Sequence, residues 1–249
     1  MRNLIINADD CGRNYVVNEA INNYIEDGVL TSTTVMANME DFEGAVNLYN
    51  KFSGIISFGA HLNLTQGSPL TDPTIFLKYG FCKIIEGCVL FNGMPFRWKY
   101  MNNELRRAAY IELDAQIKKL KNAGISLSHI DSHQHIHFAP SLTPVVATIA
   151  KDNGILKIRR PKNFLHFNVH DIAMRGLNAY YMYLLRNEKT TNFFSSAEAY
   201  VNWPKKIDAT YELMCHPGHE NPKYQEEMII LKKYLGESSG EHLISYKDL

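Results

Sequence analysis

Residues that can bind a metal or move a proton are concentrated in one short segment of the chain. Between residues 129 and 137, every second position carries such a side chain: His129, Asp131, His133, His135 and His137. If this segment is a β-strand, these side chains all point to one face, because successive residues of a strand alternate. Such a strand spans roughly 26 Å at ~3.3 Å per residue, so at most two neighbouring members can bind one ion. The remaining ligands must come from elsewhere in the chain.

Other ionisable side chains follow short apolar runs. Asp9 and Asp10 follow residues 4–7, His61 follows residues 55–58, and His216 follows a late apolar run. One carboxylate and two histidines make a ligand set with open positions, which suits Zn²⁺ or another divalent ion that keeps a water. Such an ion activates its water and polarises a carbonyl, which permits amide or ester hydrolysis. A free aspartate could then act as base and a histidine as acid.

Each of these side chains also has a structural interpretation. Adjacent aspartates suit a turn and helix N-cap about as well as they suit a catalytic pair. A lone histidine such as His61 is more often a structural residue than a ligand, and His129 is the member of its run that we expect to be structural. Cys215 beside His216 could suggest a thiol nucleophile, but neighbours in a strand point apart. We therefore do not expect cysteine catalysis.

Alternating strands and helices must position these groups. The pattern predicts strands at residues 4–7, 31–35, 55–58, 155–159 and 210–214 and in the histidine-rich run, with helices at 16–25, 45–52, 104–123 and 142–153. This alternation is typical of an α/β fold with a mostly parallel sheet, open or closed. Loops at the carboxyl edge of such a sheet converge on one mouth, so the separate clusters can complete one site.

Two segments interrupt this rhythm within what we expect to be a single domain, residues 1–249. Residues 66–103 contain scattered glycines, prolines and aromatics, which predicts an insertion that lids a cleft. For residues 162–204 the sequence predicts no helix or strand. They contain Tyr180, Tyr181 and Tyr183, which could pack against the fold or against a second copy in a homodimer.

Composition excludes several classes of protein. Lysine plus arginine and aspartate plus glutamate both number 26, so no net charge favours a nucleic-acid partner. The first residues are too short an apolar stretch for a signal peptide, and no run of about 18 apolar residues predicts a membrane span. We expect a cytoplasmic protein. The four cysteines show no C-x-x-C spacing and are too few for a disulfide framework.

Five motifs together resemble the YdjC-like carbohydrate deacetylases. They are Asn-Ala-Asp-Asp-Cys-Gly at 7–12, Thr-Ser-Thr-Thr at 31–34, Gly-Ala-His-Leu-Asn-Leu-Thr at 59–65, the histidine-rich run at 129–137, and His-Pro-Gly at 216–218. The resemblance extends from residue 3 to about residue 218. It implies a distorted (β/α) barrel, similar to polysaccharide deacetylases, and one divalent metal ion, with Zn²⁺ and Mg²⁺ as the expected candidates.

The resemblance also implies roles for individual residues. It makes Asp10, His61 and His133 the metal ligands, Asp9 the general base and His216 the general acid. Asp131, His135, His137 and Arg159 are left as candidates that support the ligands or face the substrate. Cys11 departs from the pattern, in which an aromatic residue is usual after the two aspartates, and we expect this change to affect the pocket wall.

The leading hypothesis is a metal-dependent hydrolase that removes an acetyl group from an N-acetylated amino sugar by attack of a metal-activated water. The sugar could be a chitooligosaccharide such as diacetylchitobiose or an N-acetylhexosamine of a surface-glycan precursor. Two alternatives remain open. One is a metal-dependent phosphoesterase or cyclic amidohydrolase, and the other is a catalytically silent sugar-binding protein with the same fold.

Overall fold

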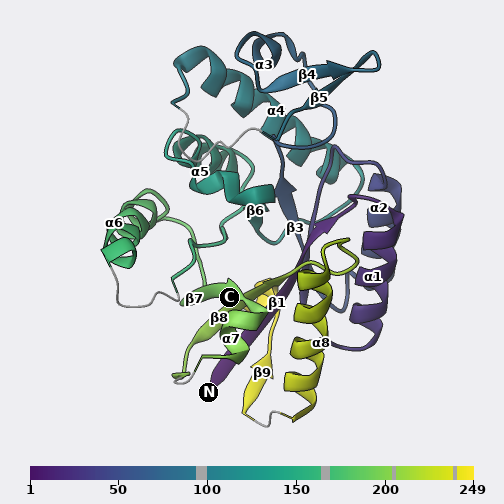
Figure 1. The fold of residues 1–249 in the computed structure, drawn as a ribbon, viewed down its shortest axis with the longest axis vertical. Helices are drawn as coiled ribbons and strands as arrows, with labels where there is room; N and C mark the ends of the chain where they lie inside the picture. The colour runs from purple at the N-terminus through teal and green to yellow at the C-terminus, as the bar shows by residue number, and fades with distance from the viewer. Residues whose placement is uncertain (94–99, 164–168, 204–205, 238–239) are drawn as a thin grey trace.

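A parallel β-sheet forms the centre of the molecule (Figure 1). The computed structural model describes residues 1–249 except 94–99, 164–168, 204–205 and 238–239. In the described residues, the sheet has seven strands in the order β6-β3-β2-β1-β8-β7, with β9 also paired to β1. These strands are β1 Arg2–Cys11, β2 Ser32–Val35, β3 Ser57–Leu62, β6 Ile130–Ser132, β7 Phe193–Ser196, β8 Thr210–Cys215 and β9 Glu241–Leu243. The paired strands of this sheet run parallel.

The sheet curls into a half-barrel that is flanked by helices. Figure 1 shows α1 (Tyr15–Glu26), α2 (Phe42–Phe52) and α8 (Pro222–Glu237) on one side and α5 (Thr143–Asp152) and α6 (Val169–Leu184) on the other, with α4 (Asn103–Asn122) across the top. The short helix α7 (Ala197–Val201) follows β7. Residues 157–163 lie between the edge strands β6 and β7. Ile158 forms a bridge with Ile130 of β6, Lys157 forms one with Lys189, and Asn163 N donates a hydrogen bond to Phe194 O of β7. The predicted α/β fold, a mostly parallel sheet in a distorted barrel, is confirmed.

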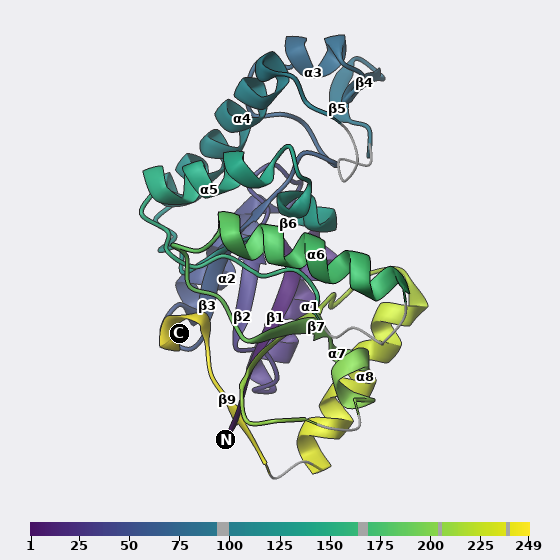
Figure 2. The same ribbon diagram turned by 90° about the vertical axis from the view of Figure 1, so that its left-hand side faces the viewer.

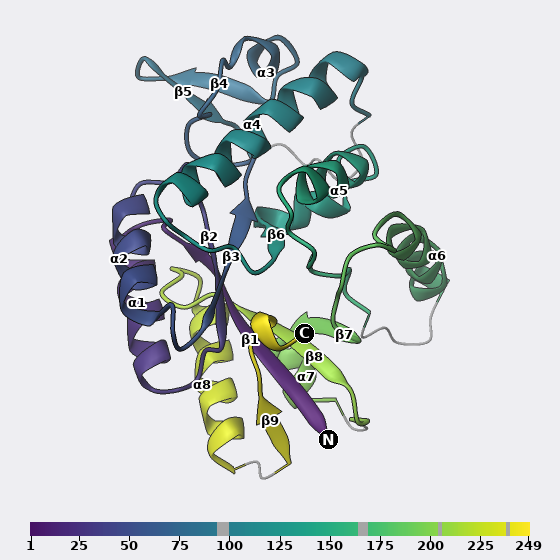
Figure 3. The same ribbon diagram turned by 180° about the vertical axis from the view of Figure 1, so that it is seen from behind.

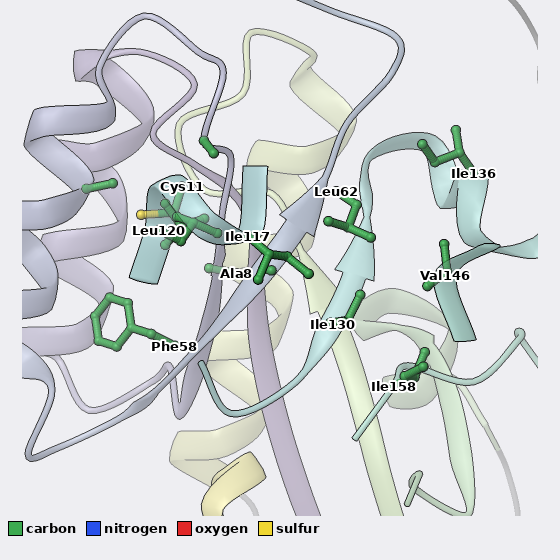
Figure 4. Close-up of a cluster of buried hydrophobic side chains, with 14 of the residues drawn as sticks. Ala8, Cys11, Phe58, Leu62, Ile117, Leu120, Ile130, Ile136, Val146 and Ile158 are labelled. Carbon is green, nitrogen blue, oxygen red and sulfur yellow. The ribbon is translucent and has the colours of Figure 1, made fainter. Parts of the chain in front are cut away.

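The central strand is buried along most of its length. Residues 4–11 of β1 are all buried, as expected for a parallel strand that is covered on both faces. Figure 4 shows how apolar side chains from β1, β3 and β6 meet those of the helices, with Leu62 and Ile130 near Ile117 and Phe58 farther along β3. This core fixes the carboxyl ends of the strands, where the ionisable residues lie.

Local signals explain where the first helix begins and ends. Asn14 caps α1, since its side chain accepts a hydrogen bond from Val17 N at 3.0 Å. The helix presents Val17, Ile21 and Ile25 to the core, at the spacing of one helical face. Gly28 follows with a φ of +70°, a left-handed conformation that glycine adopts without strain. The helix predicted at 16–25 is therefore confirmed.

Residues 66–93 form a small unit beside α4. They contain the short helix α3 (Thr74–Lys78) and an antiparallel hairpin of β4 (Cys82–Ile85) and β5 (Cys88–Phe91). Figures 1 and 2 show this unit at one end of the molecule, next to α4. Part of the predicted lid, residues 94–99, lies outside the described residues, and both the lid and the single-domain assignment remain predictions.

The histidine-rich segment is not the long strand that its alternation predicts. Strand β6 ends at Ser132, and residues His133–Phe138 form a 3₁₀ turn, η2. Gln134 and His135 have φ values of 51° and 55°, so the backbone turns there through the left-handed region. Ser132 Oγ accepts a hydrogen bond from His137 N at 3.0 Å, which closes the turn. The side chains after Ser132 therefore do not share one face.

Other elements also differ from the sequence prediction. Residues 155–159 form isolated bridges instead of a regular strand, while β1 continues four residues beyond its predicted end at Asn7. Tyr181 is buried, whereas Tyr180 and Tyr183 are exposed, so a homodimer through these tyrosines remains a prediction. Among the described helices, none combines the length and the apolar character needed to cross a membrane.

Candidate metal and catalytic site

The two adjacent aspartates reach the same cavity because the backbone of β1 is irregular at its end. The register of β1 with β2 shifts between Ala8 and Cys11, and Asp10 has a φ of 67°. In a regular strand, neighbouring side chains point to opposite faces. The bulge and the left-handed residue turn both Asp9 and Asp10 toward the cavity, and both are almost fully buried.

Asp10 lies between two histidines that come from other strand ends. Its Oδ1 is 2.8 Å from Nδ1 of His133 and 3.1 Å from Nε2 of His61. Although burial favours the neutral acid, hydrogen bonds from His133 and His61 hold the pKa of Asp10 well below its ordinary value. One ligand atom from each of these three residues lies within 4.8 Å of the others.

Asp131 fixes the orientation of His61. The Nδ1 of His61 is 2.7 Å from Asp131 Oδ1, and Thr34 Oγ1 donates to Asp131 Oδ2 at 3.0 Å. A carboxylate on one ring nitrogen directs the other, here Nε2, toward the centre of the site, an arrangement that is common behind metal-binding histidines. Burial opposes protonation of this ring, but Asp131 and Asp10 raise the pKa of His61 to about 10. The donors and their support fit a divalent cation, so Asp10, His61 and His133 could hold a metal.

Asp9 has different partners. Arg159 donates from Nη2 to Asp9 Oδ1 at 2.7 Å and from Nη1 to Asp9 Oδ2 at 2.8 Å. Asn7 Nδ2 donates to Oδ1 as well, at 2.9 Å. Burial favours the neutral acid, but the guanidinium of Arg159 holds the pKa of Asp9 well below its ordinary value. Asp9 is therefore ionised and held in one orientation beside the three candidate ligands.

His216 faces Asp9 across the cavity. Its Nε2 is 3.9 Å from Asp9 Oδ2, and its ring lies 4.3 Å from that of Tyr224, measured between centroids. Its buried Nδ1 has no hydrogen-bond partner among the described residues. Burial lowers the pKa of His216, against the opposing effect of Asp9. This histidine can exchange a proton with a group that enters the cavity.

A cavity of about 330 Å³ connects these groups. It is lined by acidic, imidazole, amide and aromatic side chains, together with one lysine and one methionine: Asp9, Asp10, His61, Gln66, His133, Gln134, His135, Lys162, Met214, His216, His219 and Tyr224. All five predicted ligands and catalytic residues are therefore on one cavity. Of the four supporting candidates, His135 reaches the cavity, whereas Asp131 and Arg159 lie behind it in contact with Asp9 or His61.

Two residues lie elsewhere than the sequence led us to expect. His137 is buried against the ring of Phe138 and hydrogen-bonded to Ser132, and so does not border the cavity. Cys11 does not form part of the cavity wall either. It is fully buried in the core, with Sγ 3.5 Å from Asn18 Oδ1, and Figure 4 shows its sulfur pointing toward the helices.

Several site residues were not identified from the sequence. Thr34 supports Asp131, and its place in the Thr-Ser-Thr-Thr motif was the available signal. His219 also lines the cavity, and its position three residues after His216 was the available signal. Glu212, on β8, accepts a hydrogen bond from Arg159, and no motif or spacing in the sequence indicates this contact.

Comparisons with known proteins agree with this architecture. A family model described as YdjC-like protein matches residues 3–242. A protein of Clostridium beijerinckii (strain ATCC 51743 / NCIMB 8052) named carbohydrate deacetylase is 31% identical over 240 residues, which covers 88% of this chain and 83% of that protein. Another protein with this name, from Vibrio parahaemolyticus serotype O3:K6 (strain RIMD 2210633), is 28% identical over 242 residues and covers 92% and 81%.

A solved structure has the same fold over almost the whole chain. It is described as a cellobiose-phosphate cleavage protein from Enterococcus faecalis V583, and it superposes with a TM-score of 0.76 at 22% identity. The match covers 99% of this chain and 98% of that one. At this identity, the likeness establishes the fold alone.

Proposed function

Because this chain belongs to the YdjC-like protein family, we propose that it is a metal-dependent deacetylase that releases acetate from an N-acetylated amino sugar. Relatives that match most of the chain are named carbohydrate deacetylases. The observation that carries the proposal is the convergence of Asp10, His61 and His133 on a cavity that also contains Asp9 and His216. This set combines candidate ligands, a base and an acid.

The candidate ligands would bind one divalent ion. When bound there, such an ion polarises the acetyl carbonyl and lowers the pKa of a water molecule. Two imidazoles and one carboxylate favour Zn²⁺ over Mg²⁺, because Mg²⁺ prefers oxygen ligands. Asp131 has a supporting part, since its hydrogen bond to His61 Nδ1 keeps Nε2 directed at the centre of the site.

The remaining residues manage protons and orientation. Asp9 takes the proton from the attacking water, while Arg159 holds both of its carboxylate oxygens in place. His216 gives a proton to the amine nitrogen as the carbon–nitrogen bond of the acetamide breaks, so the products are acetate and a free amino sugar. Asp9 is almost fully buried, and the side chain of His216 is only 15% exposed, which limits competition from bulk water.

A panel of substrates assayed with defined metals tests this proposal. The purified protein, stripped with a chelator and reloaded with Zn²⁺ or Mg²⁺, would be given diacetylchitobiose, N-acetylglucosamine and a generic phosphodiester. We expect metal-dependent acetate release from an acetylated sugar and no phosphodiester cleavage. Phosphodiester cleavage without acetate release would assign the site to a phosphoesterase. Sugar binding by calorimetry with no acetate, metal present, would identify a non-catalytic binding protein.

A further inference from the structure

The last residues of the chain are packed into the base of the sheet. They form a 3₁₀ turn, η3 (Tyr246–Asp248), directly after β9. Figure 3 shows this turn, marked C, at the middle of the sheet beside β1 and β8. Ile244 N donates to Leu4 O at 2.9 Å, and Lys157 Nζ donates to the carbonyl oxygen of Tyr246. The turn is thus attached to β1 and to the segment that carries Arg159.

Tyr246 is the buried anchor of this turn. Its side chain is fully buried, and its ring stacks on His129 with centroids 3.6 Å apart and planes 8° apart. Its hydroxyl donates to Glu212 Oε2 at 2.5 Å. Ring packing alone would require no hydroxyl, so this hydrogen bond gives Tyr246 a second, directional contact.

Glu212 connects Tyr246 to the site. It lies on β8, is fully buried, and accepts a hydrogen bond from Arg159 Nε at 2.7 Å through Oε1. Its other oxygen accepts from Tyr246. Three consecutive contacts therefore lead from the C-terminal turn to Asp9: Tyr246 to Glu212, Glu212 to Arg159, and Arg159 to Asp9.

Arg159 needs such support because of its position. The backbone of Arg159 is fixed, since its N donates to Ile130 O of β6 at 2.9 Å, but this contact does not set the direction of the long side chain. A guanidinium is planar, and its five N–H donors have fixed directions. When Glu212 binds the Nε edge, the direction of the two Nη groups is set as well. Those groups meet Asp9 and Asp131.

We propose that Glu212 and Tyr246 are positioning residues for the deacetylation reaction, which hold Arg159 in the orientation that aligns the carboxylate of Asp9 with the attacking water. This inference rests on the proposed function. Neither residue borders the cavity, so neither touches the substrate. The C-terminal turn is then part of the support of the active site and not only of the fold.

The charges in this cluster agree with a positioning role. Three carboxyl groups surround one guanidinium, and all four side chains are buried. Burial raises the pKa of Glu212 to about 7, against the effects of Arg159 and Tyr246. Asp9, whose pKa Arg159 holds well below its ordinary value, is the ionised partner of the guanidinium.

Removal of single hydroxyl and carboxyl groups tests the proposal. Tyr246→Phe keeps the ring on His129 but removes the hydrogen bond to Glu212. We expect kcat to fall on the order of tenfold, since small misalignments of catalytic groups have effects of this size or larger, with KM and metal affinity unchanged. Tyr211→Phe is the matched control, because Tyr211 is also buried at β8 but its hydroxyl bonds to Ile207, away from Arg159. This control should keep wild-type kcat.

A second pair of variants keeps the test valid if Tyr246→Phe does not fold. Glu212→Ala removes the acceptor for Arg159 Nε and should lower kcat at least as much, whereas Glu212→Gln retains an amide oxygen there and should recover most of the rate. Equal kcat in Tyr246→Phe, Glu212→Ala and the wild type would overturn the proposal. So would equal losses in Tyr246→Phe and Tyr211→Phe, because this would indicate a general loss of stability.

A structural measurement separates this inference from the proposed reaction. Crystal structures of Tyr246→Phe and Glu212→Ala should show Arg159 displaced from its two-point contact with Asp9, with Asp10, His61 and His133 in place. An unchanged Arg159–Asp9 pair would contradict the positioning role whatever the activity. If the wild type releases no acetate, the proposed function fails, but displacement of Arg159 would still show that these residues position it.

Discussion

Asp9 and Asp10 are neighbours in the chain, but their carboxylates have separate partners. Asp9 pairs with Arg159 through two hydrogen bonds of 2.7 and 2.8 Å, whereas Asp10 lies 2.8 Å from His133 and 3.1 Å from His61. The left-handed backbone at Asp10 lets both side chains reach one cavity. Two chemically identical groups can therefore do different work, one as a base and the other as a ligand.

Substitution of the base should separate catalysis from metal binding. Asp9→Asn keeps the shape of the side chain but cannot accept the proton of the attacking water, so we expect kcat to fall by about 10²–10⁴-fold. Metal affinity, measured by calorimetric titration, should stay near the wild-type value, because Asp10, His61 and His133 are untouched. Full activity in this variant would show that another group is the base.

Substitution of a ligand should instead abolish both properties. Asp10→Ala removes the carboxylate between the two histidines, and His133→Ala removes one of the imidazoles. We expect no measurable acetate release and much weaker metal binding in either variant. His242→Ala, an exposed histidine on β9, is the control and should match the wild type. Tight metal binding by Asp10→Ala would refute the proposed ligand set.

The residue behind His61 should affect the metal more mildly. Asp131→Asn weakens the hydrogen bond that directs His61 Nε2 to the centre of the site. Loss of such a supporting carboxylate typically lowers metal affinity by about 10–100-fold, and we expect a decrease in this range by competition with a chelator. An unchanged affinity would mean that other contacts orient the ring, for example the one between Thr34 Oγ1 and His61 Nδ1 at 3.0 Å.

The sequence predicted which residues would meet more closely than it predicted the path of the chain between them. Asp10, His61 and His133 stand in motifs at the ends of β1, β3 and β6, and the convergence of parallel strand ends explains why they meet. The alternation in residues 129–137 was misleading. Ionisable residues at every second position are typical of a strand, but they can also occur by chance. Here the backbone turns through the left-handed region at Gln134 and His135, and no glycine or proline signals this turn in the sequence.

The contacts that hold Asp9 could not be predicted from local patterns at all. Arg159 and Glu212 are 53 residues apart, and Glu212 and Tyr246 are 34 apart. Hydrogen bonds between such distant residues depend on the tertiary fold and leave no periodicity in the sequence. Of these three residues only Arg159 is a candidate from the sequence, through its place at the end of a predicted strand and through the family resemblance. The C-terminal turn, which follows the last recognised motif, received no prediction.

The stacking of His129 on Tyr246 should make Gly59 sensitive to substitution. A Cβ on Gly59 would lie 2.5–2.8 Å from ring atoms of His129, closer than van der Waals contact permits. Gly59→Ala must displace this buried ring, and we expect a loss of about 1–3 kcal/mol in the free energy of unfolding, as for other overpacked cores. Gly54→Ala, with open space around its Cβ, is the control. Equal denaturant midpoints for the two variants would show that the ring moves at no cost.

Glu212 should also make stability depend on pH in a defined direction. Burial raises its pKa from an ordinary value of 4.5 to about 7. Between these values the folded protein retains a proton that the unfolded chain has lost, so the contribution of Glu212 to stability falls as the pH rises from about 4.5 to above 7. Glu212→Gln cannot titrate and lacks this effect, while the other groups of the protein remain.

The difference in melting temperature between the wild type and Glu212→Gln isolates this contribution. Measured by differential scanning calorimetry from pH 5 to pH 8, the wild type should become progressively less stable relative to the variant. Most of the change should occur below pH 7, because the wild-type carboxyl loses its proton near that value in the folded state. A difference that stays constant, or that moves in favour of the wild type, would mean that Glu212 is ionised throughout and that Arg159 outweighs burial.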